Sequence, residues 1–287
     1  MKYKLFKRLL LVITLGAAMS NSTTFSKDIF FDLGGVLIRT SKSKAIPKLG
    51  FKCIFYPNYQ TELFDFLNFI DNKHDNPADA AATYLGTPLP PLFCKWQKGK
   101  LTCKQTSDYI IEHVDKNPDY FAIDGYTGKT KKELIKNGAL LILPENTAEI
   151  IKVIPNMLKL VKDLKNEKDE NGKPKHKLGI ISNYDWETIQ LLKKTIPELF
   201  GCFEEKRIII SSKVGMIKPN KDIFDYTRKE LNLSNNPKDN IFIDDQIENS
   251  ESSSKNGFTG IRHINANKTR LALKKLGILS KPVNTKK

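Results

Sequence analysis

The chain has 287 residues, 40% of them hydrophobic, so it is long enough to bury a core in one large or two modest domains and is not a disordered chain. No stretch reaches the roughly 20 consecutive apolar residues that a membrane-spanning helix needs. The formal net charge is +15, but 41 of the 47 basic residues are lysines spread along the sequence. Proteins that read nucleic acids rely on arginine for bidentate contacts, so we predict no nucleic-acid partner.

The first 20 residues have the pattern of a secretory signal peptide. Four basic residues and no acid lie within residues 1–8, an apolar run of 11 residues covers 9–19, and Ala18 and Ser20 are small enough for a signal peptidase. A buried first helix of the mature fold and an uncleaved membrane anchor are the alternatives. We predict a signal peptide at 1–20, export to the periplasm or medium, and no stable membrane insertion after its removal.

Short apolar runs and helical patterns alternate along the chain. Predicted strands cover residues 28–31, 178–182, 207–211, 240–244 and 258–264. The first four are continuous rather than alternating, as expected of strands that are covered on both faces. Helical patterns cover residues 150–165, 189–195, 221–231 and 247–256. This alternation predicts an α/β fold with a doubly wound parallel sheet.

A long insertion, residues 41–146, separates the first strand from the others. Helix-like segments cover residues 62–71, 77–84, 105–114 and 130–136, and turn signals at 88–91 and 137–138 interrupt them. We predict an α/β core formed by residues 27–40 and 147–276, with a mostly α-helical domain inserted after the first strand.

None of the four cysteines, Cys53, Cys94, Cys103 and Cys202, has the CxxC spacing of a zinc or thioredoxin-like site. In an exported protein Cys94 and Cys103 can form a disulfide across the turn between them. Free buried thiols are the alternative.

Polar residues stand at the ends of the predicted strands, where parallel sheets bind their ligands. The first strand is followed by Asp32 and, after one residue, by Gly34 and Gly35, which expose a carboxylate and allow backbone amides to approach an anion. The second ends in Ser182 and Asn183, a hydroxyl and an amide that can donate to a phosphoryl oxygen. Each piece also has a plain structural reading, as a strand-capping acid and as an ordinary turn or helix cap.

The third and fourth strands are followed by a lysine and by a pair of acids. Lys218 stands just before a helix that Pro219 and Asn220 open, a favourable place to meet an anion. Asp244 and Asp245 are adjacent at the end of a buried strand, which is costly unless a cation or hydrogen-bond donors offset their charge. Two carboxylates suit Mg²⁺. A solvated surface lysine and a helix-capping acid are the alternatives.

Taken in order, the four pieces FFDLGGVL, GIISN, VGMIKPN and FIDDQIEN resemble the four motifs of haloacid dehalogenase (HAD)-like hydrolases, in the subgroup with a cap inserted after the first motif. The resemblance covers about residues 27–40 and 147–276, and the insertion agrees with the helical cap of the family in position only. It implies a Rossmann-like core and a Mg²⁺-dependent hydrolase that removes phosphate from a small phosphorylated metabolite.

The resemblance also assigns roles to individual residues. Asp32 is the nucleophile and forms an aspartyl-phosphate, which splits one difficult displacement into two easier steps. The metal set is Asp32, the backbone carbonyl of Gly34, Asp245 and Asp244, and Asp244 also orients Lys218 or a metal-bound water.

The remaining implied contacts are to the phosphate. Ser182 and Lys218 complete the catalytic set by binding the phosphoryl oxygens, where charge must be stabilised in the transition state. Asn183, Gly34 and Gly35 are implied as further substrate-binding residues.

One position departs from the family pattern. Most phosphatases of the family carry an Asp where this sequence has Gly34, and general acid-base catalysis of that kind contributes roughly 10²–10⁴-fold. Two alternatives follow: a haloacid dehalogenase, which uses an Asp nucleophile without metal, and a non-catalytic HAD-like binding protein. The acid pair Asp244 and Asp245 favours the phosphatase over the dehalogenase.

Neither the substrate nor the oligomeric state follows from the sequence. Trp96, Lys98 and Tyr109 are candidates to face the site from the insertion, with packing in a core as the alternative for the aromatic residues.

Overall fold

The computed structural model describes residues 26–55, 59–84, 86–122 and 125–279; the predicted signal peptide at 1–20 lies outside them. Its centre is a five-stranded parallel sheet with the order β7-β6-β1-β8-β9. The strands are β1 (Lys27–Phe31), β6 (His176–Ser182), β7 (Ile208–Ile210), β8 (Asn240–Asp244) and β9 (Thr259–Arg262). Each overlaps a predicted apolar run, which confirms the predicted parallel sheet.

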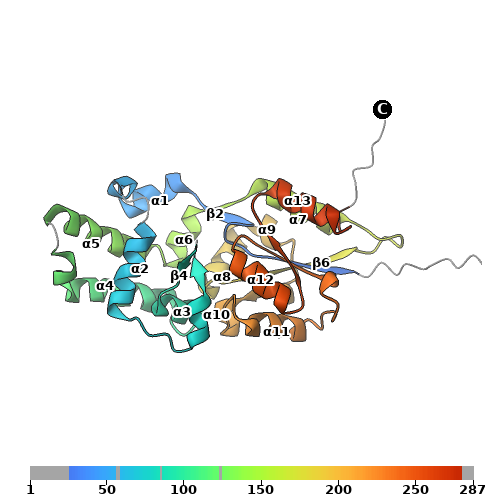
Figure 1. The fold of residues 1–287 in the computed structure, drawn as a ribbon. Coiled ribbons are helices and arrows are strands. Elements are labelled where there is room, and N and C mark those ends of the chain that lie inside the picture. The colour runs from blue at the N-terminus through green and yellow to red at the C-terminus, as the bar shows by residue number, and fades with distance from the viewer. Residues whose placement is uncertain (1–25, 56–58, 85, 123–124, 280–287) are drawn as a thin grey trace, which may run out of the picture.

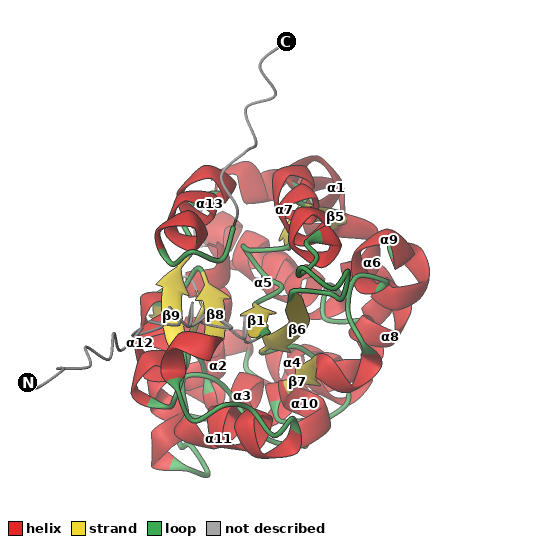
Figure 2. Ribbon diagram, turned by 90° about the vertical axis from the view of Figure 1, so that its right-hand side faces the viewer, coloured by secondary structure: helices red, strands yellow, loops and turns green. Residues whose placement is uncertain are grey.

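Helices cover both faces of this sheet, as Figure 2 shows. The helices of the core are α7 (Pro155–Asn166), α8 (Trp186–Thr195), α9 (Pro197–Phe200), α10 (Ser211–Val214), α11 (Lys221–Glu230), α12 (Ile247–Lys255) and α13 (Ala266–Lys275). Short 3-10 turns lie at η4 (Glu205–Arg207) and η5 (Pro237–Asp239). Ile29 and Phe31 of β1 pack in one core cluster with α7 and α13, whereas Phe30 packs in a second cluster with α11. Burial on both faces explains why the strands read as continuous apolar runs.

Residues 41–146, called the insert below, lie between β1 and α7 in the sequence. They are mostly helical and lie beside the sheet in Figure 1. Its helical elements are α1 (Lys42–Leu49), η1 (Phe51–Phe55), α2 (Tyr59–Ile70), η2 (Pro77–Ala81), α3 (Pro91–Gln97), α4 (Cys103–Lys116), η3 (Pro118–Phe121) and α5 (Gly125–Leu140), followed by α6 (Pro144–Ile150). A hairpin of β3 (Thr83–Tyr84) and β4 (Thr87–Pro88) lies between η2 and α3. The insert has a hydrophobic cluster that includes Phe66, Ile110 and Ile135. The segment is mostly helical, as the sequence predicts, and its assignment as a separate cap domain stays a prediction.

Two short strands join the insert to the core. β2 (Ile38–Thr40), on the way out, pairs antiparallel with β5 (Ile151–Val153), on the way back. The chain therefore leaves and re-enters the core at one place, and the exact predicted boundary at residue 146 stays a prediction.

Side-chain contacts hold the insert against the core at the carboxyl ends of the strands. The backbone N–H of Cys103 donates to Glu187 Oε2 at 2.8 Å, and its thiol donates to Asp185 Oδ1 at 3.1 Å. Asn220 Nδ2 donates to Asp79 Oδ1 at 2.9 Å. A Cβ on Gly99 would lie 2.2 Å from the carbonyl oxygen of Ser212, so the insert approaches the core backbone to backbone there.

Three local predictions are wrong. Residues 77–84 form η2 and β3 rather than one helix. The helix predicted over 150–165 begins only at Pro155, because residues 151–153 pair with β2 and proline suits the first helical position. The turn predicted at 137–138 lies inside α5, where Asn137 Nδ2 donates to the carbonyl oxygen of Leu49 at 3.0 Å.

The disulfide between Cys94 and Cys103, which the sequence leaves open, is absent, because all four cysteines are free. The Cys94 thiol is directed to carbonyl oxygens within the insert, whereas the Cys103 thiol is directed to Asp185 of the core. The free-thiol alternative holds. Among the described residues, no helix combines the length and apolarity needed to cross a bilayer.

Candidate active site

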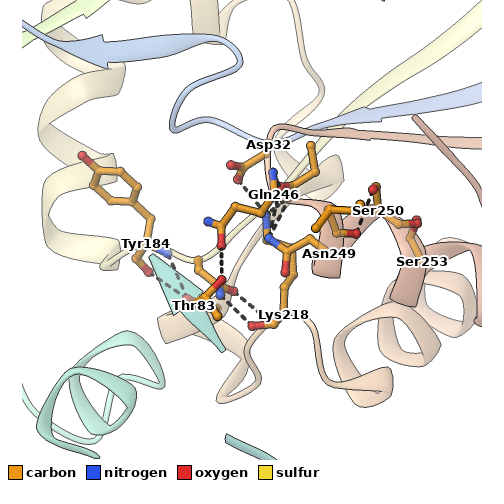
Figure 3. Close-up of polar contacts among 12 residues, drawn as sticks. Asp32, Thr83, Tyr184, Lys218, Gln246, Asn249, Ser250 and Ser253 are labelled. Atoms are coloured by element: carbon orange, nitrogen blue, oxygen red, sulfur yellow. Dashed lines mark hydrogen bonds and ion pairs between the residues drawn. The ribbon is translucent and has the colours of Figure 1, made fainter. Parts of the chain in front are cut away.

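The register of the sheet brings residues that are distant in sequence to one point. Phe31 of β1 pairs with Ile180 of β6 on one side and with Ile243 of β8 on the other. The next residue, Asp32, therefore lies level with Asp244 at the carboxyl ends of the strands, where the strand order reverses. Figure 3 shows Asp32 and Lys218 close to Asn249 and Gln246 at this point.

Lys218 links the two acids. Its ammonium lies 2.7 Å from Asp32 Oδ1 and 2.6 Å from Asp244 Oδ2, and the residue is only 1% exposed. The Asn183 side chain fixes the Lys218 backbone in both directions: the Lys218 N–H donates to Asn183 Oδ1 at 2.8 Å, and Asn183 Nδ2 donates to the Lys218 carbonyl at 2.9 Å. Asn183 thus positions the lysine, and its predicted contact with substrate stays a prediction.

Asp244 is saturated with hydrogen bonds. Its Oδ1 accepts from the backbone N–H of Gln246 at 2.8 Å and from Asn249 Nδ2 at 3.1 Å, while its Oδ2 accepts from Asn249 and from Lys218. A carboxylate with this many donors is held rigidly. The geometry therefore favours the orienting role implied for Asp244 over direct metal binding.

Burial and neighbouring charges shift the pKa values of the acids and of the lysine. Burial raises the pKa of Asp32 to about 7, although Lys218 partly opposes this. Burial, and then the neighbouring Asp244, raise the pKa of Asp245. Burial alone would lower the pKa of Lys218, but the carboxylates of Asp244 and Asp32 outweigh it and raise the pKa. Lys218 pairs with only two of these three neighbouring acids, so a further cation is favoured.

The carboxylate oxygens at this point suit a divalent cation. Ligand oxygens of Asp32, Asp244 and Asp245 all lie within 4.8 Å of one another. Asp245 Oδ1 is buried without a hydrogen-bond partner, so one ligand is directed into the site uncompensated. A Cβ on Gly35 would lie 2.2 Å from Asp245 Oδ2, and the glycine has a φ of +70°. Glycine is therefore required there for the Asp245 carboxylate to reach the site, and hard oxygen ligands of this kind suit Mg²⁺.

A second group of possible ligands, Cys103, Asp185 and Glu187, does not have this character. Burial raises the pKa of the Cys103 thiol, which keeps its proton and donates it to Asp185. Asp185 also caps α8 by accepting from the Thr188 N–H at 2.6 Å. These contacts join the insert to the core.

Residues 27–254 match the sequence model of the haloacid dehalogenase-like hydrolases. The chain belongs to this family. Among solved structures, a predicted HAD-like family hydrolase from Porphyromonas gingivalis shares the fold of our hydrolase with a TM-score of 0.51 and 19% identity, over 89% of this chain and 99% of the other.

Two further solved structures are similar at lower scores. The HAD family enzyme bt-2542 from Bacteroides thetaiotaomicron, solved with magnesium and inorganic phosphate, has a TM-score of 0.48 and 18% identity over 83% of this chain and 93% of the other. An L-2-haloacid dehalogenase from Xanthobacter autotrophicus has a TM-score of 0.47 and 12% identity over 90% and 85%. A search of curated proteins gives no match.

The predicted phosphate-binding residues of the hydrolase face a cavity of about 290 Å³. Ser182, Gly34 and Gly35 line it together with Asp32 and Lys218. The Ser182 side chain is almost fully buried beside Asp32, and its hydroxyl slightly opposes the rise in the pKa of that acid. A Cβ on Gly34 would meet nothing within 4 Å, so this position has room for the larger side chain that most phosphatases of the family carry.

Residues of the insert line part of the cavity, and only one of the three candidates named from the sequence reaches it. Trp96 lines the cavity. Lys98 instead pairs with Asp79 at 3.0 Å, and Tyr109 packs in the core of the insert against His113. Sequence reasoning missed Gln97, Thr83 and Gln246, since single uncharged polar residues carry no motif. Thr83 Oγ1 donates to Gln246 Oε1 at 2.8 Å and joins insert to core beside the acids (Figure 3).

Proposed function

We propose that this hydrolase removes phosphate from a small phosphorylated metabolite in a Mg²⁺-dependent reaction. The single observation that supports the proposal most is the cluster of three acids at the strand ends, two of them paired with Lys218 and the third, Asp245, with an unpaired oxygen beside the cavity. A dehalogenase attacks carbon and has no need of this surplus of carboxylate oxygens.

The reaction starts at the Asp32 carboxylate. Asp32 attacks phosphorus, the bond from phosphorus to the ester oxygen breaks, and an aspartyl-phosphate forms that water then hydrolyses. Lys218 and Ser182 lie beside Asp32 and bind the phosphoryl oxygens on which charge is stabilised. Asp244 and Asn183 hold Lys218 in place.

The metal would be held by Asp32, Asp245 and the backbone carbonyl of Gly34. When bound, Mg²⁺ neutralises charge between the carboxylate nucleophile and the anionic phosphoryl group. It also lets Asp32, whose pKa burial raises, remain ionised.

Gly34 leaves the ester oxygen without a protein acid at the position where relatives have one. The departing oxygen therefore takes its proton from water, and esters with acidic leaving groups are favoured.

Hydrolysis of 4-nitrophenyl phosphate by the purified protein, with Mg²⁺ and with a chelator, tests the proposal. We expect turnover that requires Mg²⁺ and is lost in Asp32→Asn, with circular dichroism to show that this variant is folded. Chloride release from 2-chloropropionate without metal would instead support the dehalogenase. The absence of both activities would support a non-catalytic binding protein.

We also propose export, on the pattern of residues 1–20. Mass spectrometry of the secreted or periplasmic protein is expected to find a new N-terminus near residue 21. An intact Met1 would contradict it.

A further inference from the structure

The charged residues of the cavity are confined to the strand ends. Asp32, Asp185, Asp245 and Lys218 line it there, and Lys218 is the only cation among the described lining residues. This lysine already pairs with Asp32 and Asp244. With a bound metal, the cavity can therefore neutralise the negative charge of one phosphoryl group and no more.

The insert contributes a mostly apolar wall to the cavity, although Gln60, Thr83 and Tyr84 also line it. Its apolar residues come from α2, from α3 and the chain just before it, and from the chain after α5: Leu63, Phe64, Leu89, Phe93, Leu141 and Ile142. A carboxylate or second phosphate on the substrate would be buried against this wall without a counter-charge, which is strongly unfavourable. An apolar group would instead be removed from water there, which is favourable.

One polar atom stands out on the insert side. Gln97, at the end of α3, lines the cavity, is only 9% exposed, and has an Oε1 that is buried without a hydrogen-bond partner. A buried acceptor costs free energy while it is unpaired, and a donor on the ligand recovers it. The lining therefore selects for a hydroxyl or N–H group on an otherwise apolar body.

The cavity also limits size. Its volume of about 290 Å³ is at the lower end of the roughly 300–1,000 Å³ typical of ligand sites. The phosphoryl group takes part of this space, so the organic group is small.

We propose that the hydrolase acts on the monophosphate ester of a small, uncharged, largely apolar compound with an acidic hydroxyl group, such as a phenol, that donates a hydrogen bond to Gln97. This inference rests on the proposed phosphatase function and narrows it. It disfavours bisphosphates, phosphorylated acids and nucleotides as substrates.

A matched pair of esters tests the charge selection. 4-Carbamoylphenyl phosphate and 4-carboxyphenyl phosphate are similar in size and differ by one charge at the far end of the ring. We expect kcat/KM to be at least about tenfold higher for the neutral amide ester. Equal or better use of the carboxylate would overturn the inference while leaving the phosphatase intact; no turnover of any ester with Mg²⁺ would overturn the phosphatase and the inference with it.

Two variants sharpen the test. Leu141→Lys places a cation at the apolar wall and should reduce the preference for the neutral ester, whereas Leu140→Lys, on the exposed neighbour, should not change the ratio. Gln97→Leu should lower the ratio of kcat/KM for the carbamoyl ester to that for phenyl phosphate by about tenfold. An unchanged ratio in both Leu141→Lys and Gln97→Leu would contradict the assignment of this wall to the substrate.

Discussion

The two sides of the cavity are built in different ways. On the strand side, Asp32, Lys218 and Asp244 are locked by hydrogen bonds and ion pairs, and Asp245 alone keeps a buried oxygen free. On the insert side the wall is mostly apolar, and Gln97 is the polar residue with an unpaired buried atom. Under the proposed function, the difference assigns the chemistry to the rigid side and the choice of substrate to the mostly apolar side.

The largest effect is expected from breaking the ion pairs on the strand side. Lys218→Met leaves two buried carboxylates without their cation, which should destabilise the fold by about 3–5 kcal/mol and abolish turnover. The control Lys221→Met removes a pair whose lysine side chain is 72% exposed and should leave the stability almost unchanged. Urea unfolding of both variants measures the change in the free energy of unfolding. Equal decreases in the two variants would contradict the claim that the buried ion pairs hold the strand side rigid.

The next largest effect concerns metal binding, and variants of two adjacent glycines distinguish it from other effects on the site. Gly35→Ala places a methyl group against the Asp245 carboxylate at a positive φ, so it should abolish the rise in Tm that Mg²⁺ produces. Gly34→Ala, whose methyl group meets nothing within 4 Å, should keep most of that rise. Thermal unfolding with and without Mg²⁺ compares them; a normal Mg²⁺ response in Gly35→Ala would argue against Asp245 as a ligand.

A third variant adds chemistry to the strand side instead of removing it. Gly34→Asp has room in the cavity and supplies the acid that this hydrolase lacks, so it should raise kcat for alkyl phosphates by about 10²-fold. The gain should be smaller for 4-nitrophenyl phosphate, because that leaving group needs little protonation. Steady-state kinetics with both esters decide it, and a fall in kcat for both would show that the position does not face the ester oxygen.

The smallest effect is in the pH dependence. Asp32 must be ionised to attack, and burial raises its pKa to about 7, so activity at low Mg²⁺ should fall as the pH drops below about 7. A saturating cation favours the ionised carboxylate and should move this limb to lower pH. Rate profiles at two Mg²⁺ concentrations test the sign; a limb that moves to higher pH at saturating Mg²⁺ would be inconsistent with metal binding by Asp32.

The same contrast explains how much the sequence could predict. The sequence predicts the strand side because continuous apolar runs end in polar residues, and a parallel sheet brings such ends together. Asp32, Ser182 and Asp244 lie at neighbouring strand ends, as expected. Asp245 was readable for the same reason.

The sequence does not predict the insert side, because the positions of its residues depend on contacts between segments that are distant in the chain. Asn137 lies in a helix despite the turn signal, since its side chain bonds to the carbonyl of Leu49. Gln97 reaches the cavity only because α3 packs against the core, and Lys98, one residue later, is turned to Asp79. No periodicity in the sequence separates these two neighbours.

The measurement that tests the central claim most directly is mass spectrometry of the protein after acid quench during turnover of a phosphate ester. The account predicts one phosphoryl group on the Asp32 side chain with Mg²⁺ present, and none with a chelator or in Asp32→Asn. A phosphoryl group on any other residue, or undiminished hydrolysis by Asp32→Asn, would contradict it.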